Sequence, residues 1–339
     1  MSLTEFLDVG ENSVLLFSAL CIVIISVLIV PLLIFITSVP FAEIIRHEQE
    51  EYYMDENQRL MKFPSIEDDW KIHLSVVVPA YNEEKRLPPM LDECLSFLNQ
   101  RQKDNAEFNY EVIIVNDGST DSTASVAAEY TKSQGSEKVR VLNLVKNRGK
   151  GGAVRLGVLS ARGAVILFAD ADGATKFSDI VKLEEELENV VSSSYLKSPE
   201  QVDQKLAIVC GSRAHLEQEA VASRSFFRTI LMYGFHFLVW MFTVRTIKDT
   251  QCGFKLFTRE AATQCFYNQH VERWAFDVEI LYIANRFHIP ISEIAVNWVE
   301  IEGSKIVPIF SWIQMAFDLF MIWFRYFIGA WDITLVTKK

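Results

Sequence analysis

The 339-residue sequence lacks a surplus of basic residues, a cysteine framework and a glycine- or proline-rich composition. Acidic residues outnumber basic ones by 44 to 33, and the net charge of −11 argues against a nucleic-acid partner, because phosphate backbones are held mainly by surplus Lys and Arg. The five cysteines form no C-x-x-C pair and no N-x-[ST] sequon occurs, as is typical of a domain in the reducing cytosol. An apolar content of 50% excludes a disordered chain, and 14 Gly with 9 Pro exclude a collagen-like one.

Charge is also missing between Glu11 and Glu43, where residues 14–36 are nearly all Leu, Ile, Val and Phe. A membrane span needs ~20 apolar residues, so residues 1–42 are predicted to hold a single transmembrane anchor. The alternative, a cleaved signal peptide, fits less well because the preceding residues carry acidic and no basic side chains. Basic residues follow the run and none precedes it, which favours a cytosolic position for the rest of the chain.

Three further segments are assigned by composition. Residues 43–70 are strongly acidic and are predicted to form a solvated juxtamembrane stalk. Residues 226–244 and 306–331 are rich in aromatic side chains with basic neighbours, a pattern typical of amphipathic helices lying in the membrane interface. Buried core helices are the alternative for both, and a second span is a further alternative for residues 306–331. The C-terminal residues 301–339 are accordingly predicted to be membrane-associated helices.

The middle of the chain, residues 71–300, alternates short apolar strands with amphipathic helices. This alternation predicts an α/β domain with a mostly parallel sheet covered on both faces. The expected strands are residues 74–78, 111–115, 139–144, 164–169 and 206–210. The expected helices are residues 86–101, 122–131, 151–161 and 177–191.

Polar clusters follow the first four expected strands, where ligands of such sheets bind. They read PAYNEE (79–84), NDGSTD (116–121), NRGKGG (147–152) and DADG (170–173). Each alone is usually a turn or a helix N-cap. The glycine-rich cluster is not a P-loop, because it lacks the G-x-x-x-x-G-K-[ST] spacing.

Together, the clusters indicate a site for a nucleoside diphosphate and one divalent cation. Asp170 and Asp172 can share Mg²⁺ or Mn²⁺, which prefer carboxylates and phosphate oxygens. Lys150 and Arg148 supply positive charge beside glycines that let a backbone approach a diphosphate. Asp117 can accept an N–H from a uracil edge.

These motifs, as VVVPAYNEE, VNDGSTD, N-x-G-K-G and FADADG, resemble those of family 2 glycosyltransferases with the GT-A (Rossmann-like) fold. The later segments DTQCGFK (249–255) and RWAFDVE (273–279) resemble the branch that glycosylates polyprenyl phosphates. The resemblance implies a UDP-sugar site formed by Pro79, Tyr81, Glu83, Asp117, Lys150 and Asp170. It also implies metal ligation by Asp170 and Asp172, a catalytic carboxylate at Asp277, and contacts to the acceptor phosphate from Arg213, Gln251 and Lys255.

The implied reaction is the inverting transfer of glucose from UDP-glucose to dolichyl phosphate, at the cytosolic face of the endoplasmic reticulum membrane, for protein N-glycosylation. A related mannosyltransferase using GDP-mannose, and a non-catalytic membrane protein that binds nucleotide sugars, are the alternatives. A nucleotidyltransferase is disfavoured because the first cluster has no G-x-G-x-R-L loop. The implied partners are UDP-glucose, dolichyl phosphate and membrane lipid, and the sequence makes no prediction of the oligomeric state.

Overall fold

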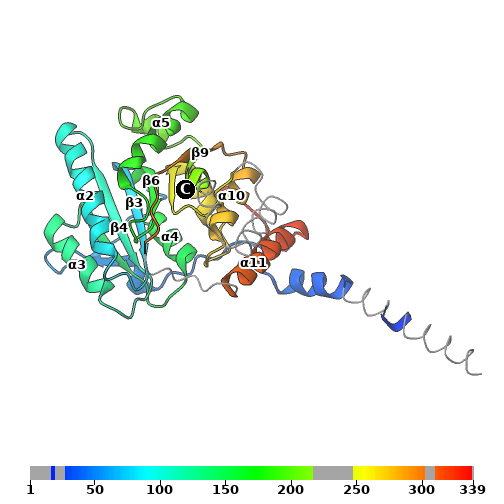
Figure 1. Cartoon of the computed structure of the whole chain (residues 1–339). Helices are drawn as coiled ribbons and strands as arrows, with labels where there is room; N and C mark the ends of the chain where they lie inside the picture. The colour runs from blue at the N-terminus through cyan, green and yellow to red at the C-terminus, as the bar shows by residue number, and fades with distance from the viewer. Residues whose placement is uncertain (1–16, 20–26, 217–246, 302–309, 338–339) are drawn as a thin grey trace, which may run out of the picture.

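A computed structural model describes residues 17–19, 27–216, 247–301 and 310–337 (Figure 1). Its centre is a seven-stranded sheet with strand order β5-β4-β3-β6-β8-β7-β9. The strands are β3 (Ile72–Ala80), β4 (Tyr110–Asn116), β5 (Val139–Asn143), β6 (Gly163–Ala169), β7 (Ile208–Ser212), β8 (Phe254–Thr258) and β9 (Ile291–Ala295). Only β8 runs antiparallel to its neighbours, β6 and β7. The predicted α/β fold with a mixed, mostly parallel sheet is therefore confirmed.

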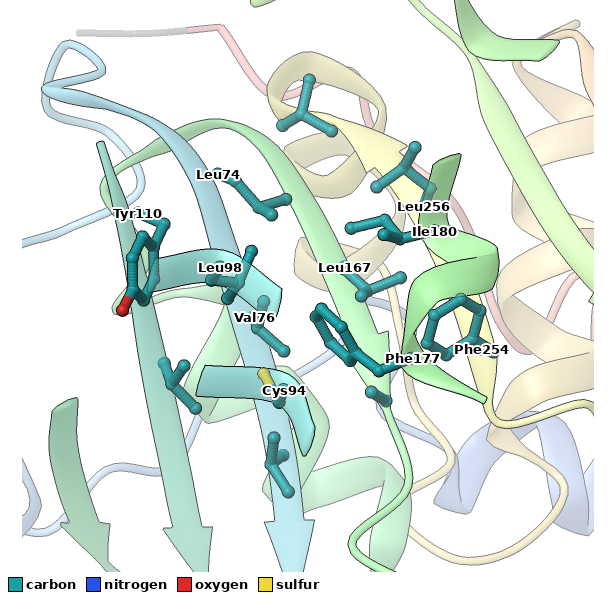
Figure 2. Packing of buried hydrophobic residues seen from close by; sticks show 14 of the residues in the cluster. Leu74, Val76, Cys94, Leu98, Tyr110, Leu167, Phe177, Ile180, Phe254 and Leu256 are labelled. Atoms are coloured by element: carbon teal, nitrogen blue, oxygen red, sulfur yellow. The ribbon is translucent and has the colours of Figure 1, made fainter. Parts of the chain in front are cut away.

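Helices cover both faces of the sheet (Figure 1). Those of the domain are α2 (Leu87–Asp104), α3 (Thr123–Gln134), α4 (Lys150–Val158), α5 (Ile180–Val191), α6 (Pro199–Val202), α9 (Arg259–Tyr267) and α10 (Phe276–Arg286), and a short 3-10 helix, η2 (Phe177–Asp179), precedes α5. Successive strand residues point to opposite faces, so β3 contributes Leu74, Val76 and Val78 to one core and Val77 to the other. Figure 2 shows the first core, in which Val76 and Leu167 of the sheet lie near Cys94, Leu98 and Phe177 of the covering helices.

The five expected strands and four expected helices are all present, with ends within a few residues of the prediction. The fifth expected strand, β7, does not pair with the fourth, β6. Residues 254–258 form β8 and insert between β6 and β7, although they lie more than forty residues after β7 in the chain. Pairing between such distant segments depends on the assembled sheet and leaves no local pattern in the sequence.

Residues 43–70 pack on the domain, and the prediction of a solvated stalk for them is wrong. They form η1 (Glu48–Glu51) and the hairpin of β1 (Tyr52–Met54) and β2 (Leu60–Lys62). Phe63 and Ile66 enter the second core, with 6% and 0% of their surface exposed. Burial of these apolar side chains outweighs the tendency of the acidic neighbours to stay in water.

The predicted membrane segments are described only in part. In the predicted anchor, residues 27–37 are helical and project away from the domain (Figure 1), while 1–16 and 20–26 lie outside the described residues. The predicted interfacial helix at 226–244 lies outside them as well. Within the described ranges, no helix has the length and apolar character needed to cross a bilayer. The second predicted interfacial segment contains α11 (Phe310–Phe327).

Candidate active site

The polar clusters lie at one edge of the sheet, beyond the carboxyl ends of β3, β4 and β6. The parallel register pairs Ala80 with Asn116 and Val77 with Phe168, so these three strands end at nearly the same level. Parallel strands bring the residues that follow them to a common edge, which is where ligands bind in open α/β sheets. The residues after β3, β4 and β6 therefore form one candidate site.

Asp117 is held at the floor of this site, with only 3% of its surface exposed. Its Oδ1 accepts the backbone N–H of Arg148 at 2.7 Å, and its Oδ2 accepts that of Gly149 at 2.9 Å. Burial raises the pKa of this carboxyl to about 6, although both backbone hydrogen bonds favour the ionised form. Each carboxylate oxygen has a second lone pair, so Asp117 can still accept a donor from a ligand.

Gly149 allows that contact through its backbone conformation. Its φ is +91°, and a Cβ at this position would lie 2.8 Å from the carbonyl oxygen of Glu272. A side chain would therefore push the loop after β5 away from the segment that precedes α10. The glycine keeps the N–H groups of this loop directed at Asp117.

The cluster after β3 is held by an ion pair and by a hydrogen bond to the first residue of α3. Glu83 accepts two hydrogen bonds from the Arg86 guanidinium, at 2.6 and 2.7 Å, and its backbone N–H donates to Thr123 Oγ1 at 2.7 Å. Glu83 is 8% exposed, whereas Tyr81 is 37% exposed. Tyr81 is thus accessible to a ligand, and the Glu83 carboxylate is engaged by Arg86.

Lys150, the first residue of α4, lies beside the first acidic residue of the DADG cluster. Its Nζ is 2.7 Å from Oδ1 of Asp170, and the two side chains are 17% and 34% exposed. Burial and the charge of Asp170 together raise the pKa of Asp172. Two neighbouring carboxylates with incompletely balanced charge are a hard oxygen donor set that suits Mg²⁺ or Mn²⁺.

Asp170 and Asp172 thus fit a divalent cation as two of its ligands. Among the described residues, no group of three or more His, Cys, Asp or Glu side chains is placed to hold a metal. The remaining ligands must then be water or oxygens of a bound diphosphate, which is the usual arrangement for Mg²⁺ at phosphate-binding sites.

Gly253 determines the position of Asp170. A Cβ on Gly253 would lie 1.9 Å from Oδ2 of Asp170, and the Asp170 N–H donates to the Gly253 carbonyl at 3.0 Å. The backbone that precedes β8 thus lies directly against this carboxylate. This contact places the DTQCGFK segment directly against the DADG cluster.

Lys255 and Asp277 form a buried pair beside this contact. Lys255 Nζ donates to Asp277 Oδ1 and to the Cys252 carbonyl, each at 2.6 Å. Burial is the largest influence on the Asp277 carboxyl and raises its pKa, while the charges of Lys255 and Lys150 act in the opposite direction. Lys150 Nζ and Lys255 Nζ lie 5.1 and 5.7 Å from the centroid of the same Phe168 ring, so the two ion pairs are neighbours.

Arg213 is engaged by a residue to which the sequence assigned no role. Its guanidinium donates to both oxygens of Asp249, at 2.7 and 2.8 Å, and stacks on Trp298 at 5.4 Å. The hydrogen bonds to Asp249 hold the pKa of Arg213 above its usual value against the effect of burial. Gln251 lies between Asp249 and Gly253 in the chain and is half-buried. Pro79, the remaining predicted donor residue, is part of β3 and half-buried.

The structure corrects the prediction for Arg148. Its guanidinium points away from the site and pairs with Glu50 at 3.0 Å, and the two side chains are 3% and 0% exposed. Only the backbone N–H of Arg148 reaches the site. The sequence does not distinguish Glu50 from its acidic neighbours Glu48 and Glu51. Arg86, Asp249 and Gly253 lie within or beside the motifs, but no local pattern indicates their contacts.

Comparison with known families identifies the class of protein. A family model described as glycosyl transferase family 2 matches residues 75–266, which include most of β3, the strands β4 to β8 and the DADG cluster. The chain belongs to this family.

Three relatives match over most of the chain, and each is called dolichyl-phosphate beta-glucosyltransferase. The Drosophila melanogaster protein is 56% identical over 326 residues, which cover 96% of this chain and 97% of the relative. The Homo sapiens protein is 55% identical and covers 92% and 94% of the two chains. The Saccharomyces cerevisiae protein is 47% identical, with 78% of each chain covered.

Among solved structures, glucosyl-3-phosphoglycerate synthase from Mycobacterium tuberculosis aligns with a TM-score of 0.49 and 16% identity. The alignment covers 76% of this chain and 80% of the synthase. A likeness this distant does not bear on the ligands of the present chain.

Proposed function

We propose that this chain transfers glucose from UDP-glucose to dolichyl phosphate with inversion at C1, giving dolichyl β-glucosyl phosphate for protein N-glycosylation. One observation carries the proposal. The Lys150–Asp170 and Lys255–Asp277 pairs lie on the same Phe168 ring, so the predicted donor and acceptor motifs lie side by side. The names of the relatives, which match along nearly the whole chain, support glucose as the sugar and dolichyl phosphate as the acceptor.

The donor half of the site would bind the UDP group. Asp117 would accept the N–H of the uracil ring, and Tyr81 would line the base. Glu83, which is held by Arg86, would also contact the uridine. Lys150, at the N-terminus of α4, would approach the diphosphate. Lys150 and the first backbone N–H groups of that helix both favour a bound anion.

Asp170 and Asp172 would hold Mg²⁺ or Mn²⁺. A divalent cation bound there supplies positive charge against the diphosphate of the leaving UDP. Lys150 adds a second positive charge on the same side, 2.7 Å from Asp170. The residues of this chain thus stabilise the negative charge that develops as the bond from C1 to the UDP oxygen breaks.

The acceptor half would bind and orient the phosphate of the lipid. A phosphate monoester with a second pKa of about 6 is already ionised near pH 7, so its oxygen can attack C1 without a strong base. Asp277 would then orient Lys255 and the attacking oxygen rather than remove a proton. Arg213 and Gln251 would contact the same phosphate from the loops after β7 and before β8.

We also propose that the site opens toward the bilayer of the endoplasmic reticulum from its cytosolic side, because dolichol stays in the membrane. The predicted anchor at 1–42 and the predicted helices at 226–244 and 301–339 would hold it there, with the catalytic domain over 71–300. The exposure of Phe317, Phe320 and Phe327 on α11, at 60%, 39% and 71%, supports a lipid contact for that helix.

The test is a donor panel with the full chain in lipid nanodiscs, dolichyl phosphate and Mg²⁺ or Mn²⁺. UDP-glucose, UDP-galactose and GDP-mannose are offered separately, and the lipid product is identified by mass spectrometry. Transfer from UDP-glucose alone is the expected result. Transfer from GDP-mannose but not from UDP-glucose would overturn the assignment of the sugar, and binding of UDP-glucose without any transfer would favour a non-catalytic sugar-binding protein.

A further inference from the structure

Glu50 contacts the loop between β5 and α4 at two points. Its Oε1 accepts the Val145 backbone N–H at 3.0 Å, and its Oε2 accepts Arg148 Nη2 at 3.0 Å and the His47 backbone N–H at 2.9 Å. Glu50 is fully buried, although it belongs to the segment that leads from the predicted anchor into the domain. A buried carboxylate with this many charge-assisted and backbone donors fixes the groups that it binds.

The opposite side of the same loop faces the nucleotide site. Asp117 accepts the backbone N–H groups of Arg148 and Gly149, at 2.7 and 2.9 Å. Residue 148 is therefore held twice, by its side chain from Glu50 and by its backbone from Asp117. The guanidinium also donates to the Ile45 carbonyl, which adds a second attachment to the N-terminal segment.

Residues 43–50 are also attached to α4 and to the turn that follows it. Arg155 Nη2 donates to the Glu43 carbonyl at 2.6 Å, and Arg46 Nη2 donates to Ser160 Oγ at 2.9 Å. The Arg155 side chain is 2% exposed, so its bond is shielded from water. The segment thus spans α4, whose first residue, Lys150, faces Asp170.

We propose that residues 43–50 are part of the donor-site framework, and that Glu50 is a positioning residue that sets the geometry of Asp117 for the nucleotide through Arg148. The inference rests on the proposed binding of UDP-glucose at this site. A conventional role for Glu50, as a counter-ion that only stabilises buried Arg148, would change the stability of the fold without changing the affinity for the donor.

The test compares Glu50→Gln with wild type as the full chain in nanodiscs, using UDP-glucose without acceptor as the probe. The Gln amide has a single oxygen, so its N–H groups must face a donor of the loop, either the Val145 N–H or the Arg148 guanidinium, and the loop is expected to shift. Calorimetry should show affinity weakened at least about tenfold, the scale of one charge-assisted hydrogen bond. Amide hydrogen exchange should increase in residues 145–149 and stay unchanged in β4.

Glu51→Gln is the matched control, because the neighbouring Glu51 pairs with Lys62 at the surface and does not reach the loop. It should bind UDP-glucose as wild type does. If Glu50→Gln does not fold, Glu50→Gln with Arg148→Gln removes both buried charges and should still bind more weakly than wild type.

Wild-type affinity in the Glu50 variant that folds, or weaker affinity with unchanged exchange in residues 145–149, would overturn the inference and leave the proposed function standing. Absence of UDP-glucose binding by wild type would overturn both.

Discussion

Lys255 and Asp277 lie 2.6 Å apart, from Nζ to Oδ1, with side-chain exposures of 1% and 5%. Lys255 belongs to β8 and Asp277 to the first turn of α10, which begins eighteen residues after β8 ends. A charge-assisted hydrogen bond at this depth fixes both side chains. The proposed acceptor side of the site therefore has an ammonium group whose orientation depends on the Asp277 carboxylate.

Replacing that carboxylate should slow the chemical step. In Asp277→Asn, Lys255 loses its counter-ion and its orientation, and the single-turnover rate is expected to fall about 100-fold, the scale of one lost electrostatic contact to a transition state. Rapid-quench measurement with labelled UDP-glucose checks this. Asp332→Asn, at an exposed position, is the control and should react at the wild-type rate. A rate for Asp277→Asn within a few-fold of wild type would remove Asp277 from the reacting groups.

Binding of UDP-glucose should depend on pH through Asp117. Burial raises the pKa of this carboxyl to about 6, and a uracil N–H that donates to it favours the ionised form. Binding should therefore release a proton near pH 6, and the affinity should rise from pH 5 to pH 7 and then level off. UDP-glucose itself is not a phosphate monoester, so its phosphates do not titrate in this range.

Calorimetry in buffers of different ionisation enthalpy measures that proton release directly. Asp117→Asn is the control, since it removes the titrating group. Its amide keeps one of the two oxygen acceptors, so the variant is compared with wild type through the shape of the pH profile and not through the absolute affinity. The component of the pH dependence assigned to Asp117 should vanish in this variant. Identical pH profiles for the variant and wild type would show that Asp117 does not sense the bound base.

The same pKa shift has a consequence for stability. The pKa of Asp117 is raised from 3.8 to about 6 in the folded protein, so folding binds a proton between these values and this contribution to stability is lost as the pH rises through 6. A shift of about two pKa units corresponds to roughly 3 kcal/mol at most. The free energy of unfolding of Asp117→Asn relative to wild type is therefore expected to increase from pH 4.5 to pH 7.5, on top of a pH-independent cost because the amide has one oxygen for two backbone N–H groups. Thermal unfolding of both proteins at the two pH values measures this difference.

Gly253→Ala should disable the donor site without unfolding the domain. The new Cβ would lie 1.9 Å from Oδ2 of Asp170, and the Asp170 carboxylate, one-third exposed, can swing away. Activity is expected to fall on the order of 100-fold, as for the loss of one preorganised electrostatic group. In Gly253→Ala with Asp170→Asn, the second change should add little, because residues that act as a unit are not additive. Full additivity in this cycle would contradict the assigned contact.

Glu111 offers a stability test away from the site. It is fully buried near the amino end of β4, accepts hydrogen bonds from Ser75 Oγ at 2.6 Å and Arg162 Nε at 2.9 Å, and pairs with buried Arg140. Glu111→Gln leaves a buried guanidinium without its counter-ion, at a cost of about 3–5 kcal/mol in the free energy of unfolding. Denaturant unfolding checks this, and the activity of the folded fraction should be unchanged.

The matched control is Glu137→Gln, which removes a partner of the same Arg162 at the surface. Glu137 is 84% exposed, and exposed ion pairs contribute roughly 0–1 kcal/mol. An equal effect of the two variants would contradict the importance of burial in this cluster.

The sequence alone predicts the strands and helices whose apolar residues repeat at a regular spacing within the element. The apolar run of β3 and the helical spacing of α2 predict those elements within a few residues. The clusters at the carboxyl ends of β3, β4 and β6 were predictable for the same reason, because a parallel sheet brings such ends together.

The contacts that set the direction of a side chain were not predictable. Arg148 stands in a glycine-rich turn beside Lys150, yet it faces the buried Glu50 while Lys150 faces Asp170. The direction of the Arg148 side chain depends on the packing of residues 43–50, which lie about one hundred positions earlier in the chain. The same holds for Gly253, whose need for a missing Cβ arises only when β8 inserts beside β6.

The most direct measurement for the whole account is the anomeric configuration of the lipid product in a single turnover. The full chain in nanodiscs, with dolichyl phosphate and Mg²⁺ or Mn²⁺, is mixed with UDP-[1-¹³C]glucose, and the C1 signal is followed by NMR. One displacement at this site predicts dolichyl β-glucosyl phosphate as the first product, and its loss in Asp172→Asn. An α-linked product, or a β-linked product formed equally fast by Asp172→Asn, would contradict the account.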